Sequence, residues 1–349
     1  MKSRFDRDLL DNLNPYSSEV SVSDGNLARL HANELPWKNE AVIWALHDKL
    51  LSMPLNRYPE VTNSEIRKKI ADYTGFEKEN VLVGNGSDEI IDTICKAFIS
   101  PLDKVLIPSP TFSMYSAMTK VYSGLPILIP LNPDFTLPVE KITSEAKNAK
   151  ISFICSPNNP TGISYPEEEI KAILDTGLLV ILDEAYADFS GNSGLSLLNN
   201  YNNLIVIKTF SKAFGLAGFR TGYCVASETL IQSMSKVILP YNLNLISMKV
   251  IELAIQHEDF MKDAVRKIKE NRNYLYGTMQ EINGIKPIQS SANFILFEAE
   301  NPREIYEGLL KKGILIRYFE NKNYLRVSVG TYEECVKFIS SLREILNVC

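Results

Sequence analysis

The sequence lacks any uninterrupted apolar run near the roughly 20 residues that a bilayer-spanning helix needs. The first eight residues carry cations with no apolar stretch behind them, so we expect no secretory signal and a cytoplasmic protein. Basic side chains are not in excess either, because 37 Lys and Arg stand against 42 Asp and Glu, for a net charge of −5. This mixed, slightly acidic composition argues against a nucleic-acid-binding protein.

Cysteine and histidine are also scarce. The five cysteines are odd in number and widely spaced, with no Cys-x-x-Cys pair, which is typical of free thiols in a reducing compartment. The three histidines, His31, His47 and His257, lie far apart and never at the spacing of metal ligands. We therefore expect neither a disulfide framework nor a metal site.

Three short apolar runs stand out in the middle of the chain, at 151–155, 178–182 and 204–207. They are rich in β-forming residues and almost wholly apolar, as strands buried on both faces are. Segments with helical spacing separate them, and this alternation predicts an α/β fold with a mostly parallel, doubly wound sheet. A length of 349 residues suits one large domain with a smaller partner.

Beyond about residue 245 the pattern changes. We expect one long amphipathic helix over about 245–282 and then a strand at 292–297. A helix over 302–312 and strands at 314–318 and 324–329 follow. The last helix begins in the capping box Thr331-x-x-Glu334. This order predicts a small α+β domain.

Polar motifs follow the three central runs: Ser-Pro-Asn-Asn-Pro-Thr-Gly at 156–162, Asp-Glu-Ala-Tyr at 183–186 and Lys-Thr-Phe-Ser-Lys at 208–212. The carboxyl ends of parallel strands meet at one edge of a sheet, where ligands gather, so we expect a shared site. A fourth motif, Val83-Gly-Asn-Gly-Ser-Asp-Glu89, places backbone amides at the start of a helix, which suits an anion. It is neither a dinucleotide fingerprint nor a P-loop, because the glycine and lysine that these motifs require are missing.

In this order and spacing, the motifs resemble those of the pyridoxal-phosphate (PLP) aminotransferases of fold type I. The resemblance implies a large PLP-binding domain over 36–244 and a small domain formed by 1–35 and 245–349. It implies pyridoxal 5'-phosphate as the cofactor, held by Lys212 as a Schiff base and acting as an electron sink. It also implies a homodimer, with Tyr58 lent to the phosphate in the neighbouring subunit.

The same resemblance implies a role for the residues around Lys212. Asp183 would keep the pyridine nitrogen protonated, and Tyr186 and Asn159 would bind the phenolic oxygen of the cofactor. Tyr115, in Pro110-Thr-Phe-Ser-Met-Tyr115, would stack on the ring. The cofactor phosphate would be bound by the backbone amides of Ser87 and Asp88 and by Thr209, Ser211 and Arg220.

Further segments, at 12–16, 30–34, 57–60, 313–317 and 325–331, resemble the histidinol-phosphate aminotransferases. The implied reaction converts L-histidinol phosphate and 2-oxoglutarate to imidazole-acetol phosphate and L-glutamate. Arg326 would bind the substrate phosphate in one half-reaction and the carboxylate of glutamate in the other. The implied substrate pocket comprises Tyr16, Asn33, Tyr241, Asn293, Arg317 and Arg326.

The match departs from the family pattern at His31, Leu35 and Asn85, which makes the choice of substrate less determined than that of the cofactor. A threonine-phosphate decarboxylase-like enzyme and an aromatic amino-acid aminotransferase on the same scaffold remain alternatives. A PLP-binding transcription regulator is disfavoured by the acidic charge and by Tyr16 and Asn33, which already match enzyme motifs near the start of the chain.

Overall fold

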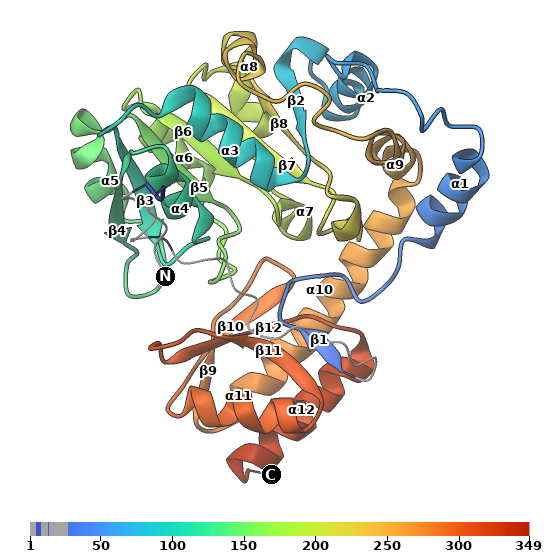
Figure 1. Cartoon of the computed structure of the whole chain (residues 1–349). Helices are drawn as coiled ribbons and strands as arrows, with labels where there is room; N and C mark the ends of the chain where they lie inside the picture. Colours follow the sequence, from blue (N-terminus) through green and yellow to red (C-terminus); the bar gives the residue numbers. More distant parts are fainter. Residues whose placement is uncertain (1–4, 8–12, 14–26, 349) are drawn as a thin grey trace.

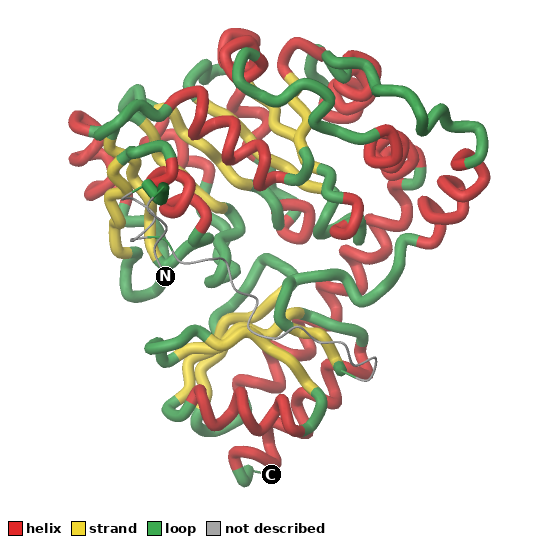
Figure 2. Tube along the Cα trace, viewed as in Figure 1, coloured by secondary structure: helices red, strands yellow, loops and turns green. Residues whose placement is uncertain are grey.

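Two β-sheets in separate lobes organise the computed structural model, which describes residues 5–7, 13 and 27–348 (Figures 1 and 2). The larger sheet has seven strands in the order β2-β8-β7-β6-β5-β3-β4, and the smaller has five in the order β1-β11-β12-β10-β9. The expected α/β architecture with a second, smaller sheet is confirmed. Apart from β1, which precedes the large sheet in the chain, all strands of the small sheet follow those of the large one.

The large sheet is mostly parallel. Its strands from β3 to β7 run parallel to one another, and β8 is antiparallel to both β2 and β7. The three apolar runs are confirmed as neighbouring strands in the middle of the sheet. The strands are β2 (Val81–Gly84), β3 (Lys104–Ser109), β4 (Leu125–Pro130), β5 (Ile151–Cys155), β6 (Leu179–Asp183), β7 (Leu204–Thr209) and β8 (Gly222–Ala226).

Burial on both faces explains why these strands are apolar throughout. Phe153 belongs to an apolar cluster with α3 (Ser87–Phe98), α4 (Met114–Val121) and α8 (Glu228–Ser235). The next residue, Ile154, belongs to a second cluster with α5 (Val139–Glu145) and α6 (Glu167–Leu174). Because successive side chains point to opposite faces, the two clusters cover the two sides of one sheet.

The small sheet follows the predicted order of strand, helix, two strands and helix. Its strands are β1 (Ala28–Leu30), β9 (Ile285–Pro287), β10 (Phe294–Ala299), β11 (Ile314–Tyr318) and β12 (Tyr324–Ser328), with helices α11 (Pro302–Lys311) and α12 (Tyr332–Leu346). The capping box of Thr331 and Glu334 is present at the start of α12. β1 pairs parallel with β11, with Leu30 opposite Ile316, so the chain before the large lobe adds a strand to the small sheet.

The single helix expected over 245–282 is wrong. The structure has α9 (Leu245–Gln256) and α10 (Glu258–Gln280), which meet at His257, whose φ of −110° and ψ of 39° are not helical. The amphipathic pattern continues through both helices, so periodicity alone does not reveal the break. Figure 1 shows α10 running from the upper lobe down to the lower one.

The remaining helices cover the edge of the large lobe near β2 or connect its strands. They are α1 (Glu40–Leu50), α2 (Ser64–Thr74) and α7 (Ala187–Ser190), with short 3-10 turns at 78–80, 146–148, 194–199 and 217–219. α1 and α2 both pack on α9. Within the part of the chain that the structure describes, no helix combines the length and apolarity needed to cross a bilayer.

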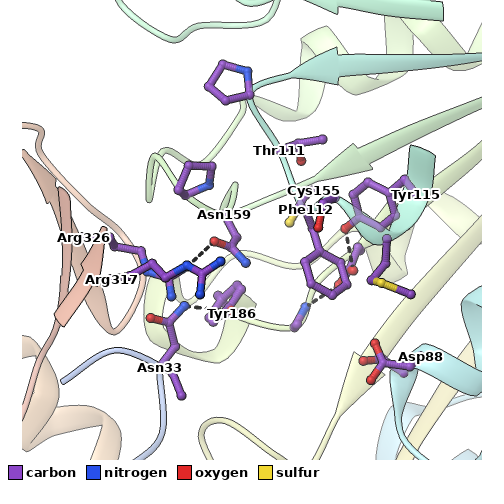
Figure 3. A pocket seen from close by; sticks show the side chains of 18 of the residues that line it. Asn33, Asp88, Thr111, Phe112, Tyr115, Cys155, Asn159, Tyr186, Arg317 and Arg326 are labelled. Atoms are coloured by element: carbon purple, nitrogen blue, oxygen red, sulfur yellow. Dashed lines mark hydrogen bonds between the residues drawn. The ribbon is translucent and has the colours of Figure 1, made fainter. Parts of the chain in front are cut away.

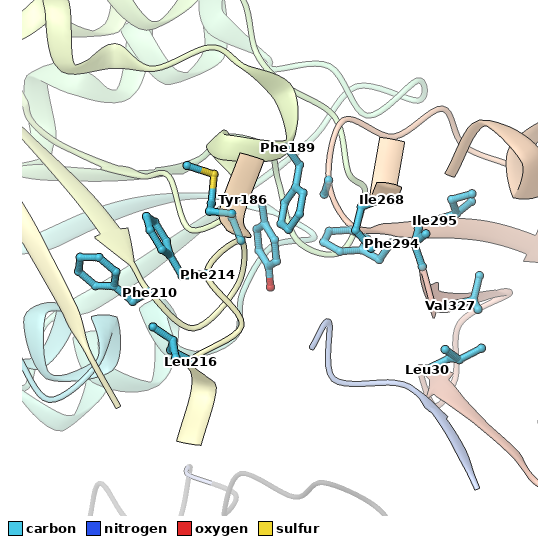
Figure 4. Close-up of a cluster of buried hydrophobic side chains, with 14 of the residues drawn as sticks. Leu30, Tyr186, Phe189, Phe210, Phe214, Leu216, Ile268, Phe294, Ile295 and Val327 are labelled. Atoms are coloured by element: carbon cyan, nitrogen blue, oxygen red, sulfur yellow. The ribbon is translucent and has the colours of Figure 1, made fainter. Parts of the chain in front are cut away.

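One apolar cluster joins the two lobes (Figure 4). From the large lobe it contains Tyr186, Phe189 and Phe210, and from the small sheet Phe294 and Val327. Ile268 of α10 belongs to the same cluster. This shared core sets how the edges of the two sheets face each other.

Candidate active site

A cavity of about 1220 Å³ lies between the lobes and is lined by residues of both. The carboxyl ends of β5, β6 and β7 open into it, as the positions of the three motifs predicted. The predicted site residues that line it are Asn33, Ser87, Asp88, Tyr115, Asn159, Asp183, Tyr186, Thr209, Ser211, Lys212, Arg220, Arg317 and Arg326. Residues that are far apart in the sequence thus share one space.

Lys212 follows β7 and reaches across toward the chain of the small lobe. Its Nζ donates a hydrogen bond to the carbonyl oxygen of Ala32 at 3.1 Å and lies 5.6 Å from the ring centre of Tyr186. Burial, reinforced by the positive charge of Arg326, lowers the pKa of the Lys212 amine to about 8. The neutral, nucleophilic form of the amine is therefore far more populated near neutral pH than in a solvated lysine.

Asp183 ends β6 and is almost fully buried. One carboxylate oxygen accepts a hydrogen bond from the Tyr115 hydroxyl at 2.6 Å, and the other accepts from the backbone N–H of Ala185 at 3.0 Å. Burial raises the pKa of Asp183, and the hydrogen bond from Tyr115 acts against that rise. A buried carboxylate held in this way suits a cationic partner in the cavity, such as a protonated ring nitrogen.

The ring of Tyr115 is not placed to stack on a ligand in the cavity. It has no solvent-accessible surface and stacks on Phe153 of β5, with ring centres 4.8 Å apart and an interplanar angle of 9°. Phe112 from the same motif is only partly buried and lines the cavity (Figure 3). We propose that Phe112 faces the cofactor ring and that Tyr115 supports Asp183. Both aromatic residues belong to one motif, and the sequence does not indicate which of the two rings lines the cavity.

The turn before α3 and the segment around Arg220 form a cradle that fits a phosphate. α3 begins at Ser87, so its first backbone amides have no helical partner. The Arg220 guanidinium lies beside this end, 2.8 Å from the Asp88 carboxylate. A Cβ at Gly222 would lie 2.6 Å from the Ser87 nitrogen, and one at Gly86 would lie 2.6 Å from Arg220 Nη2. Only glycine allows this close approach, and the donors present suit an anion.

Thr209 and Ser211 connect this cradle to β7. The Thr209 hydroxyl donates to the carbonyl oxygen of Thr221 at 3.2 Å and accepts from the backbone N–H of Ser211 at 3.1 Å. These bonds hold the chain on either side of the Lys212 turn. Ser211 also lines the cavity.

Two arginines from the small sheet face the motifs of the large one. Arg326 on β12 donates to the Asn159 side-chain oxygen, and its other terminal nitrogen donates to the carbonyl oxygen of His31 at 2.7 Å. Arg317 on β11 is its cross-strand partner and lines the same cavity (Figure 3). Two adjacent guanidinium groups suit an anion with several oxygens.

Three predicted residues do not line the cavity, and a fourth is not described by the structure. Tyr16 lies outside the described residues. Tyr58 and Tyr241 stack on each other with ring centres 4.7 Å apart and are 82% and 41% exposed, away from the cavity. Asn293 is buried, and its amide donates to the backbone oxygen of Asn33 at 3.0 Å without lining the cavity. Their roles toward cofactor or substrate stay predictions.

PLP needs a lysine amine, a partner for its ring nitrogen and a phosphate site, and the cavity offers all three in one place. Together with the two-lobed architecture, this defines a transferase of fold type I. A solved structure, histidinol-phosphate aminotransferase from Sinorhizobium meliloti in complex with pyridoxal-5'-phosphate, has the same fold, with a TM-score of 0.88. It is 23% identical and covers 99% of this chain and 98% of its own.

The family follows from the sequence itself. Residues 26–342 match the family model for aminotransferase class I and II. A histidinol-phosphate aminotransferase from Pyrococcus furiosus is 41% identical over 86% of this chain and 87% of its own length. One from Thermococcus gammatolerans is 39% identical over 97% and 96%. The chain belongs to the class I and II aminotransferases and is a PLP-dependent enzyme.

The phosphate cradle can be tested by filling its tightest space. Gly222→Ala should weaken PLP binding by roughly tenfold or more, because overpacking costs about 1–3 kcal/mol. Gly277→Ala in α10, where a Cβ meets nothing within 4 Å, is the matched control and should bind PLP like the wild type. The measurement is a fluorescence titration of each apoenzyme with PLP. An unchanged dissociation constant for Gly222→Ala would contradict the cradle.

Proposed function

We propose that the enzyme transfers the amino group of L-histidinol phosphate to 2-oxoglutarate, giving imidazole-acetol phosphate and L-glutamate, a step of histidine biosynthesis. The observation that carries this proposal is the pair of arginines at the substrate side of the cavity. A phosphate monoester carries close to two negative charges at neutral pH, and two guanidinium groups match it better than one. The names of the curated relatives support the same reaction.

Both half-reactions use Arg326 in this proposal. Histidinol phosphate has no carboxylate, so Arg326 and Arg317 bind its phosphate, and glutamate presents a carboxylate to the same side chains. Arg326 already lies against Asn159, which links the anion site to the cofactor side of the cavity. A ping-pong cycle follows, since the two substrates use one site in turn.

Bound PLP supplies an electron sink for the charge that develops at the substrate carbon. We assign the proton transfer at that carbon to the Lys212 amine, which its lowered pKa makes suitable as a base near neutral pH. Asp183 holds a proton on the ring nitrogen through its buried carboxylate. Tyr186 and Asn159 bind the phenolic oxygen, and Phe112 shields the ring face. The small lobe contributes Arg326 and Arg317, which face these cofactor-binding residues across the cavity.

The substrate assignment can be tested by comparing amino donors. With 2-oxoglutarate, L-histidinol phosphate should give the highest kcat/KM, and L-histidinol should be about ten- to a hundredfold poorer because charge-assisted hydrogen bonds are lost. Arg326→Gln should impair both half-reactions. Arg303→Gln, an exposed arginine of α11 paired with Glu307, is the matched control and should not. Glutamate formation and CO₂ release are measured for each donor.

Faster turnover of phenylalanine would contradict the proposal and assign an aromatic aminotransferase. Release of CO₂ from threonine phosphate would assign the decarboxylase. If Arg326→Gln slowed only the amino-acid half-reaction, the shared anion site would be wrong.

We further propose that the enzyme is a cytoplasmic homodimer. Exposed apolar side chains gather in α1 and the loop after it, which extends at the right of Figure 1. Tyr58 of this loop stacks on Tyr241, where the exposed Leu239 lies two residues away. Large exposed apolar surfaces of this kind mark protein interfaces. The side chains are Ile43, Trp44, Leu50, Leu51, Leu55, Tyr58, Val61, Leu239 and Tyr241.

In this dimer we assign Tyr58 to the phosphate cradle of the neighbouring subunit. The free buried thiols of Cys95, Cys155, Cys224 and Cys335 suit a reducing compartment. Both features agree with a dimer that works in the cytoplasm.

The dimer can be tested by placing charge on the apolar surface. Leu51→Asp combined with Trp44→Asp should convert the protein to monomer and weaken PLP binding, because Tyr58 is then lost from the partner site. Leu102→Asp, at a leucine that is 72% exposed on another turn, is the control and should leave the dimer intact. Sedimentation velocity measures the state. A wild-type monomer with full activity would contradict the proposal.

A further inference from the structure

Asn33 makes more contacts at the junction of the lobes than a substrate ligand requires. It lies just after β1 with a φ of +55° and is 1% exposed. Its backbone N–H donates to the Ser328 hydroxyl at 2.9 Å, and its backbone oxygen accepts from the Asn293 amide at 3.0 Å. Its own amide nitrogen donates to the Tyr186 hydroxyl oxygen at 3.0 Å (Figure 3). Asn33 therefore joins two positions of the small lobe to a side chain of the large one.

The direction of the contact with Tyr186 is fixed by the rest of the network. The Ser328 hydroxyl oxygen accepts a hydrogen bond from the Asn33 backbone N–H, and the same hydroxyl donates to Asn33 Oδ1 at 3.1 Å. The amide oxygen is thus the acceptor toward Ser328, and the NH₂ group is the one that faces Tyr186. An amide N–H can only donate, so the Tyr186 oxygen accepts here and its O–H proton is left to point elsewhere.

Packing holds the Tyr186 ring in place, so only the direction of its O–H bond can change with the surrounding hydrogen bonds. Phe294 of β10 packs edge-on against the ring, with centres 5.1 Å apart and an interplanar angle of 85° (Figure 4). Lys212 Nζ lies over the same ring. A buried tyrosine hydroxyl with its oxygen occupied by one donor directs its proton toward the remaining polar space, which here is the cavity.

We propose that Asn33 is a positioning residue that turns the Tyr186 proton toward the phenolic oxygen of PLP. This inference rests on the cofactor role proposed above for Tyr186 and replaces the substrate role predicted for Asn33. Through the bond from Asn33, the small lobe also orients the Tyr186 hydroxyl, a hydrogen-bond donor to the cofactor. The same lobe carries the substrate arginines.

Other charged groups act on the Tyr186 phenol as well. Burial raises the pKa of Tyr186 most strongly, Asp183 and Cys155 add to the rise, and Arg326 and the Asn33 hydrogen bond oppose it. The phenol therefore stays protonated across the working range of pH. It acts as a hydrogen-bond donor to the cofactor, and its own titration plays no part.

Two substitutions test the hydrogen bond between Asn33 and Tyr186: one reverses its direction and the other removes it. Asn33→Asp keeps the size of the side chain and the acceptor for Ser328, and Asp also tolerates a positive φ. Its second oxygen accepts the Tyr186 proton and so reverses the contact. Asn33→Gly keeps the backbone conformation and removes the side chain. Both substitutions are compatible with the positive φ of residue 33, whereas an alanine there would strain the backbone.

The readout is the pH midpoint of the visible absorption band of the PLP-loaded enzyme, together with its PLP dissociation constant. Tyr186→Phe and Asn33→Asp should each raise the midpoint by about one pH unit, because a donor to an anionic oxygen is lost and protonation becomes easier. The double variant should shift no further than Tyr186→Phe alone. Asn39→Asp is the control: this buried asparagine donates to the Phe214 carbonyl oxygen and should leave the midpoint unchanged.

Wild-type midpoints for Asn33→Asp and Asn33→Gly, with a shifted Tyr186→Phe, would overturn the inference. If Asn33→Asp fails to fold, Asn33→Gly decides alone. An unshifted Tyr186→Phe would overturn the cofactor role of Tyr186 and this inference with it. Because no substrate is added, failure of the histidinol-phosphate assignment would leave these spectra as predicted.

Discussion

The contacts across the cavity between the two sheets are the constraint on which the site depends. Arg326 reaches Asn159, Asn33 reaches Tyr186 and Lys212 reaches the carbonyl oxygen of Ala32. Each pair joins a residue of the small lobe, or of the segment that follows β1, to a motif after a large-sheet strand. The apolar cluster around Tyr186 and Phe294 lies beneath these bonds and fixes their spacing. A shift of one lobe would separate the substrate arginines from the cofactor residues.

Burial pushes the two central charged groups toward their neutral forms. It lowers the pKa of Lys212 to about 8 and raises that of Asp183. A bound cofactor brings a cationic ring nitrogen to Asp183 and an anionic phosphate to Arg220, so it supplies charges that these residues need. Next to them, Lys208 is already paired with Glu184 and Asp188 at 3.4 Å and 3.5 Å, which ties the ends of β6 and β7 without entering the cavity. The cavity residues thus suit a ligand that carries both charges, and the buried ion pairs of Lys208 stabilise the sheet beside them.

The sequence predicted elements whose pattern is local. β5, β6 and β7 are apolar because both faces are buried, and the capping box of Thr331 identifies the start of α12. The break at His257 escaped prediction because the amphipathic pattern runs through it. Phe112 and Tyr115 differ only in how their motif is oriented, which depends on packing against Phe153. The bond from Asn33 to Tyr186 joins residues 153 positions apart and becomes visible only in the folded chain.

The most direct measurement is trapping of the lysine that carries the cofactor. Apoenzyme is exposed briefly to PLP over a range of pH, reduced with borohydride and digested, and the labelled peptide is located by mass spectrometry. We predict label on Lys212, with an extent that rises with pH through a midpoint near 8, since the neutral amine is the reactive form. Label on another lysine, or a midpoint near the ordinary value of 10.5, would contradict a site built around a buried Lys212 between the lobes.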